Sequence, residues 1–249
     1  MEGGNILKNS QIIILGVCIA AATIISSSIL SGGFIKVMKF TREQISVTGS
    51  AQKDIHSDLI AWRGTFSRRE PGLRQAYESL KQDLEKVTKY MAEKGVAESD
   101  FSISSIVTAT VYKKDEKGND TNGIEGYTLS QSVEVWSKEV EKVAAISRES
   151  TRLIEQGVEF CSDAPQYFYT KLDELKLEML AKASENARQR AERMVQSAGN
   201  RIGVMRSARM GVFQITPVAS TDVSDYGMND TTSYDKKVTA VVTANFGIR

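Results

Sequence analysis

The hydrophobic pattern divides the chain at Thr41 into a continuous apolar run and a longer region of alternating polar and apolar residues. Residues 11–30 read QIIILGVCIAAATIISSSIL, without a charged side chain. About 20 such residues can cross the hydrocarbon core of a bilayer as one helix. We therefore predict a short tail over 1–10, a transmembrane anchor over 11–35 and one folded domain over 41–249. The apolar side chains of the predicted span are Ile12, Ile13, Ile14, Leu15, Val17, Ile19, Ile24, Ile25 and Leu30.

A cleaved signal peptide is the alternative interpretation of this segment. Lys8 would be its basic start, residues 12–25 its apolar centre, and Ser26–Ser28 the small residues near a cleavage site. The apolar run is long compared with the roughly 7–15 residues of such a centre. We therefore favour a retained anchor.

The charges beside the span bear on its orientation. Lys8 precedes the span, whereas Lys36, Lys39 and Arg42 follow it. Counted alone, the positive-inside tendency would place the folded domain in the cytoplasm.

After Thr41 the pattern alternates between the periods of strands and helices. Ile45, Val47 and Gly49 alternate with polar residues, as in a half-buried strand. A stripe of apolar residues at spacings of three and four predicts a helix over 71–95. Its members are Leu73, Tyr77, Leu80, Leu84, Val87 and Met91. In chain order we predict strands 45–51 and 56–68, helix 71–95, strands 101–112 and 127–135, helix 137–156, strand 158–169, helix 171–198, and strands 202–215 and 236–247.

Turn and cap residues mark the limits of these elements. Lys53 and Asp54 are expected at a turn between the first two strands, and Ser137 is expected to cap a helix. Thr170 with Asp173 resembles a capping box at the start of the long helix. The polar stretches 113–126 and 217–233 are expected to form surface loops.

The order of elements indicates the fold class. Residues 56–169 follow the order strand, helix, strand, strand, helix, strand, which is the split β-α-β arrangement of ferredoxin-like folds. The first strand and the last elements are expected to form a second layer of sheet and long helix. The predicted class is α+β, preceded by one transmembrane helix.

The long helix carries small residues in the middle of its apolar face. Ala183, Ala187 and Ala191 would allow another backbone to approach closely, and Met194 extends the same face. Packing on the chain's own sheet is one interpretation, and contact between subunits is the other. Tyr226 and Met228, in the loop over 217–233, are further candidates for contact with a neighbouring subunit.

Composition narrows the possible chemistry. The net charge of +1 gives no broad electrostatic basis for binding nucleic acid. One histidine and two cysteines leave no His-rich or Cys-rich metal site within one chain. We therefore assign no catalytic, cofactor-binding or metal-binding residue and expect no enzymatic activity.

Three local features could indicate chemistry, but each has a simpler structural interpretation. His56 lies beside Ser57, but neighbours on a strand point to opposite faces, so a surface histidine is favoured over a catalytic triad. Cys161 is expected to be a half-buried strand residue. The aspartates of the last loop allow a calcium ion as an alternative, but their spacing does not match an EF-hand, so a solvated loop is favoured. They are Asp222, Asp225 and Asp230.

Several segments together resemble the SIMPL domain family, also called DUF541. They are Ile45-Ser46-Val47-Thr48-Gly49-Ser50-Ala51, Gly126-Tyr127-Thr128-Leu129 through Val135, Leu172-Asp173-Glu174-Leu175 through Ala181-Lys182-Ala183, Asn186-Ala187-Arg188, Ala191-Glu192, and Ala198-Gly199-Asn200-Arg201-Ile202-Gly203. The resemblance covers essentially everything after Thr41. Each motif is weak alone, but their order and spacing make the assignment fairly specific.

The resemblance implies a non-enzymatic cell-envelope protein, because the family includes periplasmic and stress-defence members that build large ring-like or cage-like oligomers. It favours a folded domain outside the cytoplasm, against the charge count, on a single-pass protein of the bacterial inner membrane. The expected partners are further copies of the chain and the lipid bilayer, with no nucleic acid and no cofactor. The alternative is a membrane-tethered binding module that recognises an envelope ligand or partner through the loops over 113–126 or 217–233.

Overall fold

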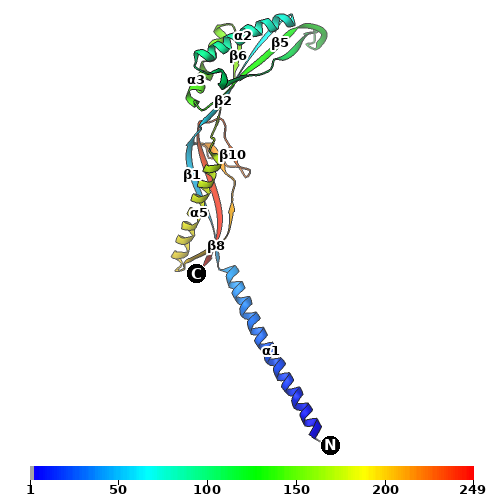
Figure 1. The fold of residues 1–249 in the computed structure, drawn as a ribbon, viewed down its shortest axis with the longest axis vertical. Coiled ribbons are helices and arrows are strands. Elements are labelled where there is room, and N and C mark those ends of the chain that lie inside the picture. The colour runs from blue at the N-terminus through cyan, green and yellow to red at the C-terminus, as the bar shows by residue number, and fades with distance from the viewer. Residues whose placement is uncertain (1–2) are drawn as a thin grey trace. The chain divides into compact units, whose positions relative to one another are not determined.

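The computed structural model describes residues 3–249, and the side chains of residues 14–35, 38 and 43–249. The N-terminal segment forms helix α1 (Gly3–Arg42) (Figure 1). Its stretch Ile14–Ile35 has a mean hydropathy of 2.1 and is long and apolar enough to cross a membrane. The side chains of Ile12, Ile13, Lys36, Lys39 and Arg42 lie outside the described residues.

Polar side chains within this stretch bond to the helix itself. Thr23 Oγ1 donates to the carbonyl of Ala20, and Ser28 Oγ donates to the carbonyl of Ile24, both at 2.8 Å. Hydroxyls satisfied inside a helix are tolerated in hydrocarbon, where an unsatisfied polar group is costly. Thr23 and Ser28 are therefore compatible with a bilayer span.

A six-stranded antiparallel sheet follows, with the ferredoxin-like order that the sequence predicted. Its strands are β2 (Leu59–Glu70), β3 (Phe101–Ile103), β4 (Val107–Lys114), β5 (Asp120–Ser137), β6 (Glu159–Ser162) and β7 (Gln166–Phe168). The order is β3-β5-β2-β6, with β4 beside β5 and β7 beside β2. Strands β2 and β5 are the first and third in the predicted order of strand, helix, strand, strand, helix, strand. They therefore lie beside each other at the centre of the sheet.

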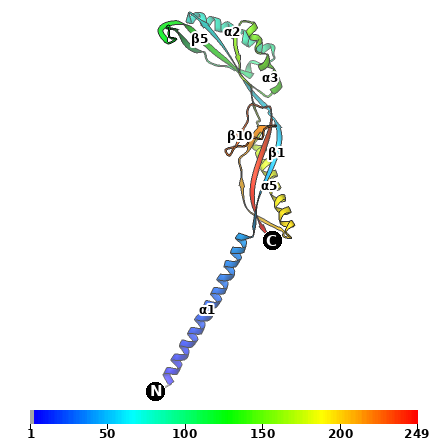
Figure 2. The ribbon, with the colours of Figure 1, turned by 180° about the vertical axis from the view of Figure 1, so that it is seen from behind.

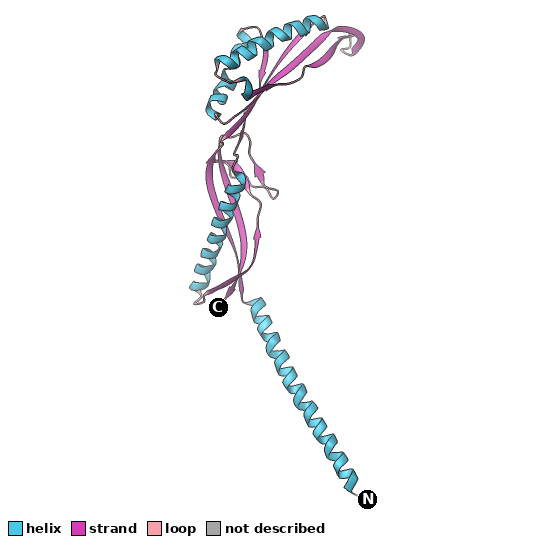
Figure 3. Cartoon of the chain, in the orientation of Figure 1, coloured by secondary structure: helices cyan, strands magenta, loops and turns pink. Residues whose placement is uncertain are grey.

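Helices cover one face of this sheet (Figure 3). They are α2 (Leu73–Glu93), α3 (Val140–Glu149) and the short α4 (Arg152–Glu155), with a 3-10 turn at Glu98–Asp100. Ile60, Trp62 and Phe66 of β2 point to the covered face and are at most 2% exposed. These three side chains stand at even-numbered positions, so alternate residues of β2 face the helices.

The predicted stripe of α2 is wrong at its N-terminal end. Leu73 and Tyr77 are 47% and 51% exposed, while Ala76 and Tyr90 are buried. Asp83 is also buried on this face. The core side of the helix is therefore rotated away from the two exposed residues.

The remaining strands form a second, five-stranded sheet. They are β1 (Gln44–His56), β8 (Ile202–Met210), β9 (Gln214–Pro217), β10 (Met228–Asn229) and β11 (Asp235–Ile248). The order is β1-β11-β9-β10, and β8 also pairs with β11. The long helix α5 (Leu172–Ser197) lies along β1 (Figure 2).

Close backbone packing joins α5 to β1. Ala187 and Ala191 are fully buried against Val47, Ala244 and Phe246. Such packing needs small residues on the helix, because a larger side chain would separate the two backbones. The small residues of α5 thus pack on the chain's own sheet, which is the first of the two interpretations given for them above.

The structure divides the chain into two compact units, each made of separate stretches. The first unit comprises Met1–Ala51, Leu180–Gly211 and Val241–Arg249. The second unit comprises Gln52–Met179 and Val212–Ala240. The sequence indicated one domain over 41–249.

Several predicted boundaries are corrected by side-chain hydrogen bonds. Strand β1 continues through Lys53 and Asp54, where a turn was expected, and Lys53 Nζ pairs with Glu178 of α5 at 2.7 Å. A charged residue with such a partner is accommodated within a strand. The hydroxyl of Thr170 donates to Asp58 Oδ2 at 2.7 Å, where a capping box with Asp173 was expected.

The helix expected over 137–156 is two helices, α3 and α4. Ser147 and Ser150 donate to carbonyls three residues earlier, at 2.9 and 2.8 Å, and such local bonds compete with helical ones. Ser137 accepts a hydrogen bond from the N–H of Glu139 at 3.1 Å, and α3 begins only at Val140. Ser137 therefore forms a turn before the helix.

The loop expected over 113–126 is largely strand, because β4 and β5 form a long hairpin. Asp115 Oδ1 accepts hydrogen bonds from the N–H groups of Lys117 and Asn119, both at 2.9 Å. Hydrogen bonding from Asn119 lowers the pKa of the Asp115 carboxyl. This carboxylate-capped turn replaces most of the predicted loop.

Candidate functional site

The residues expected at a subunit interface fall into two groups. Ala183, Ala187 and Ala191 are fully buried within the chain, so they are not available to a second subunit. Met194 and Tyr226 are 55% and 98% exposed. Met228, in β10, is half-buried. Contact of these last three with a neighbouring subunit stays a prediction.

The loop over 217–233 is fixed at its C-terminal end. Asp230 Oδ1 accepts from the N–H and hydroxyl of Thr232, at 2.8 and 2.7 Å. Burial opposes ionisation of Asp230, but these hydrogen bonds prevail and lower its pKa. Among the described residues no group of three His, Cys, Asp or Glu side chains is placed to hold a metal ion. Asp222, Asp225 and Asp230 are therefore not gathered as a calcium site.

Lys236 is a buried lysine that the sequence did not reveal. The residue is 2% exposed, and its Nζ donates to the carbonyl of Tyr167 at 2.6 Å and to that of Asp230. Burial lowers the pKa of the ammonium group. Lys236 thus ties the loop over 217–233 to β7.

His56 is a surface residue, as predicted. Its side chain is 74% exposed, its Nδ1 lies 2.6 Å from Asp235 Oδ1, and its ring stacks on Tyr234. The hydroxyl of Ser57 donates to the carbonyl of Tyr234, so it does not bond to the imidazole. This geometry does not pair a nucleophile with a base.

Cys161 is exposed, where a half-buried position was expected. It lies opposite Thr65 of β2, on the face of the sheet that the helices do not cover. The strand alternation that buries Phe160 turns Cys161 outward.

The uncovered face of the six-stranded sheet carries two rows of side chains across three strands. In one row Trp136 of β5, Ala61 of β2 and Gln166 of β7 are register partners. In the next row Glu134 pairs with Arg63. The N–H of Asp163 donates to the carbonyl of Arg63 at 3.0 Å, which extends that row.

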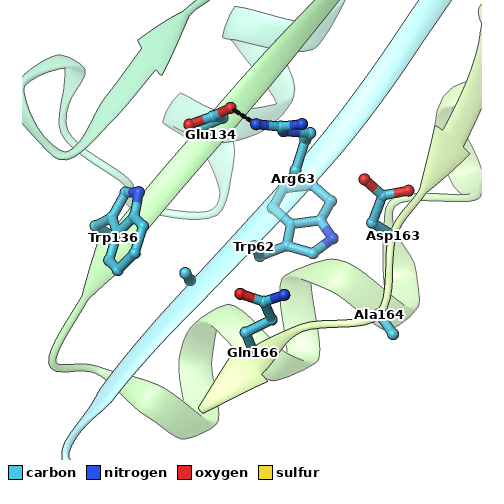
Figure 4. A pocket seen from close by; sticks show the side chains of 8 residues that line it. Trp62, Arg63, Glu134, Trp136, Asp163, Ala164 and Gln166 are labelled. Carbon is cyan, nitrogen blue, oxygen red and sulfur yellow. Dashed lines mark hydrogen bonds and ion pairs between the residues drawn. The ribbon is translucent and has the colours of Figure 1, made fainter. Parts of the chain in front are cut away.

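These rows surround a pocket of about 220 Å³ (Figure 4). Arg63 and Glu134 form an ion pair at one side, and Trp136, Gln166 and Asp163 lie around the remaining rim. The small side chains of Ala61 and Ala164 leave the space between them open. The remaining lining residue is Trp62, whose buried ring donates from Nε1 to Ser162 Oγ at 3.0 Å.

Strand β4 is a free edge of the same sheet. It pairs with β5 on one side, and seven of its eight residues are exposed. Its segment from Val107 to Val111 contains no charge and no proline, and the register is regular up to Val111. Val107 and Tyr112 are 62% and 42% exposed. An edge of this kind is a template for pairing with another strand.

The sequence pattern reveals neither the pocket nor the free edge of β4. Each depends on the order and register of β2, β4, β5 and β7, which the sequence pattern does not specify. The exposed Trp136, one of two tryptophans, was the available signal.

Comparison with known proteins identifies the same family that the sequence motifs resemble. The model of a family described as SIMPL, protein of unknown function (DUF541), matches residues 45–246. No curated protein matches the chain. The match spans both compact units and most of the chain, from β1 to β11. The chain therefore belongs to the SIMPL (DUF541) family.

Proposed function

We propose that the protein is a non-enzymatic, membrane-anchored envelope protein that assembles with copies of itself into a large ring, cage or scaffold. The free edge of β4 carries this proposal. In the proposed topology α1 spans the bacterial inner membrane once and the folded units lie outside the cytoplasm. Membership of the SIMPL family over residues 45–246, together with the envelope members of that family that the sequence resembles, supports that orientation.

The composition of β4 favours pairing over protection. Natural sheet edges are commonly shielded by lysine, proline or a bulge. In β4 the lysines and the register shifts follow Val111, so the five residues before them are unshielded. Five residues are a typical strand length, and strand addition satisfies main-chain groups of both partners.

A membrane anchor strengthens such association. Chains held in one bilayer by α1 meet at a higher effective concentration than free chains. They also share one direction relative to the membrane, which favours closed symmetry about its normal. An edge contact that is too weak to hold free chains together in solution can therefore hold them together at the membrane.

The test is the mass of the full-length protein in mild detergent, measured by light scattering over a range of concentrations. We expect a discrete mass that is a multiple of the 27.4 kDa chain. The variant Ala109→Lys places a charge on the edge and is expected to raise the dissociation constant about tenfold or more. Ala97→Lys adds the same charge at an exposed position outside the strands and should leave the mass unchanged.

A monomer at all concentrations would overturn the proposal. A large particle that is unaffected by Ala109→Lys would retain assembly but remove β4 as its basis.

The exposed Tyr226 favours the second candidate, a membrane-tethered binding module. An aromatic ring that is 98% exposed on a loop is available for a partner. Under this proposal Tyr226→Ala abolishes capture of the envelope partner without changing particle size. Retained capture would count against the loop over 217–233, and the same experiment on the β4–β5 hairpin tests the other predicted loop.

A further inference from the structure

We propose that the pocket on the uncovered sheet face binds one pyranose ring of a saccharide. The inference goes beyond assembly and does not depend on it, because it rests on β2, β5 and β7 and not on the edge of β4. Its elements are an aromatic platform, a set of hydrogen-bonding groups, and a volume suited to one ring.

The platform is Trp136 supported by Phe168. The two rings stack with their centroids 5.6 Å apart and an interplanar angle of 23°. Phe168 holds the indole in place, yet Trp136 remains 54% exposed. A pyranose ring has an apolar face of C–H groups, which packs against an aromatic ring that is fixed and partly solvated.

The polar groups around the platform offer both donors and acceptors. Asp163 supplies acceptors, Gln166 supplies both, and the Arg63–Glu134 pair supplies one of each. Sugar hydroxyls both donate and accept, so they match this mixed set better than a purely apolar or purely cationic ligand does. Figure 4 shows these side chains around the pocket, and Ala61 also belongs to its lining.

Charge and size exclude other classes of ligand that stack on tryptophan. The three charged residues of the lining, Arg63, Glu134 and Asp163, sum to one negative charge, which disfavours a nucleotide phosphate. The pocket of about 220 Å³ is smaller than the roughly 300–1,000 Å³ of sites for drug-sized ligands. A single ring of a longer glycan fits these limits, because the open rim lets the remaining units extend into solvent.

The two tryptophans give a direct test. Trp62 is 2% exposed and Trp136 is 54% exposed, so a ligand on the platform changes the emission of Trp136 first. Full-length protein in detergent is titrated with chitotriose, cellotriose and glucosamine, each up to roughly 10 mM, above the millimolar dissociation constant expected for one small ring. We expect a saturable change in emission with at least one of them.

Variants connect this signal to the pocket. Trp136→Phe should retain binding because it keeps an aromatic platform. Because this variant lacks the fluorescent indole of the pocket, its binding is measured by calorimetry. Trp136→Ala and Gln166→Ala should each weaken binding about tenfold or more, because they remove the stacking surface or a hydrogen-bonding group. Tyr226→Ala removes an even more exposed aromatic ring outside the pocket and should bind as the unmodified protein does.

Three outcomes would overturn the proposal. They are the absence of a saturable change with all three saccharides, equal binding by Trp136→Ala in calorimetry, and tighter binding of choline than of any saccharide. The last result would identify the platform and its carboxylates as a cation site.

Discussion

Gly49 of β1 and Ala187 of α5 place a strand and a helix in direct backbone contact. A Cβ atom added at Gly49 would lie 2.3 Å from the amide nitrogen of Ala187 and 2.3 Å from the carbonyl oxygen of Ala183. Neither of these backbone atoms can move without displacing the helix. Glycine at position 49 therefore sets the distance between α5 and its sheet.

Gly49→Ala is expected to destabilise the first unit by about 3 kcal/mol or more, because overpacking against backbone cannot relax through a rotamer change. Hydrogen exchange is the suitable measurement, since both tryptophans lie in the second unit. Peptides from residues 180–197 should exchange faster in the variant.

Gly72→Ala is the matched control for this substitution. The nearest atom to a Cβ at Gly72 is 4.0 Å away, which is ordinary contact. Its effect should stay within about 1 kcal/mol in either direction. Equal exchange in both variants would contradict the close approach of α5 to β1.

Arg68 and Asp83 form a second decisive pair, in the other unit. Both Nε and Nη2 of Arg68 donate to the Asp83 carboxylate, whose side chain is 1% exposed. The hydrogen bond to Asp83 raises the pKa of the Arg68 guanidinium further. Asp83→Asn leaves a charge near the core without its partner and should cost roughly 3–5 kcal/mol, measured as a lower urea midpoint of tryptophan fluorescence.

Glu78→Gln is the control for this loss of charge on α2. Glu78 pairs with Arg74 at 2.9 Å on the surface, where both side chains are more than half exposed. A change below about 0.5 kcal/mol is expected there. If both variants lost the same stability, burial of Asp83 would not explain its effect.

Lys236 predicts a pH dependence with a definite sign. Burial lowers the pKa of this lysine below its ordinary 10.5, so the unfolded chain binds more protons between the two values. The free energy of unfolding should therefore rise with pH in that window. The measurement is the difference between the unmodified protein and Lys236→Met in urea titrations from neutral pH to pH 10.5, which cancels other groups. If the difference in the free energy of unfolding between the two proteins were constant with pH, a lowered pKa of Lys236 would be contradicted.

Removal of α1 should preserve both compact units. The described side chains of Ile14–Ile35 are exposed and contribute to neither core. A chain that begins at Thr41 is expected to keep the circular dichroism of the folded domain and the same number of subunits per particle, reached at a higher protein concentration. A monomer at every concentration would show that α1 drives association.

The ferredoxin-like order could be predicted because hydrophobic period and element order are local properties of the sequence. The alternation of Ile60, Trp62 and Phe66 identified the buried face of β2 directly. The apolar run before Thr41 likewise predicted α1 from length and composition.

The buried charges could not be predicted in the same way. Asp83 has the sequence context of a solvated helix residue, and its partner Arg68 lies 15 positions earlier on a strand. Lys236 depends on carbonyls of Tyr167 and Asp230, which only the folded chain brings together. A charged residue within an apolar stripe indicates that it has a partner in the fold, but the sequence does not identify that partner.

The pairing of β1 with β11 has a consequence for the order in which the protein is made. Thr48 and Thr243 contact one another across 195 positions, so β1 leaves the ribosome long before its neighbour exists. At about 5–20 residues per second, this delay is on the order of 10 s or more. During that time the edge of β1 that later pairs with β11 stays open. A chaperone that shields this edge of β1 would therefore act on the growing chain, before any assembly of finished subunits begins.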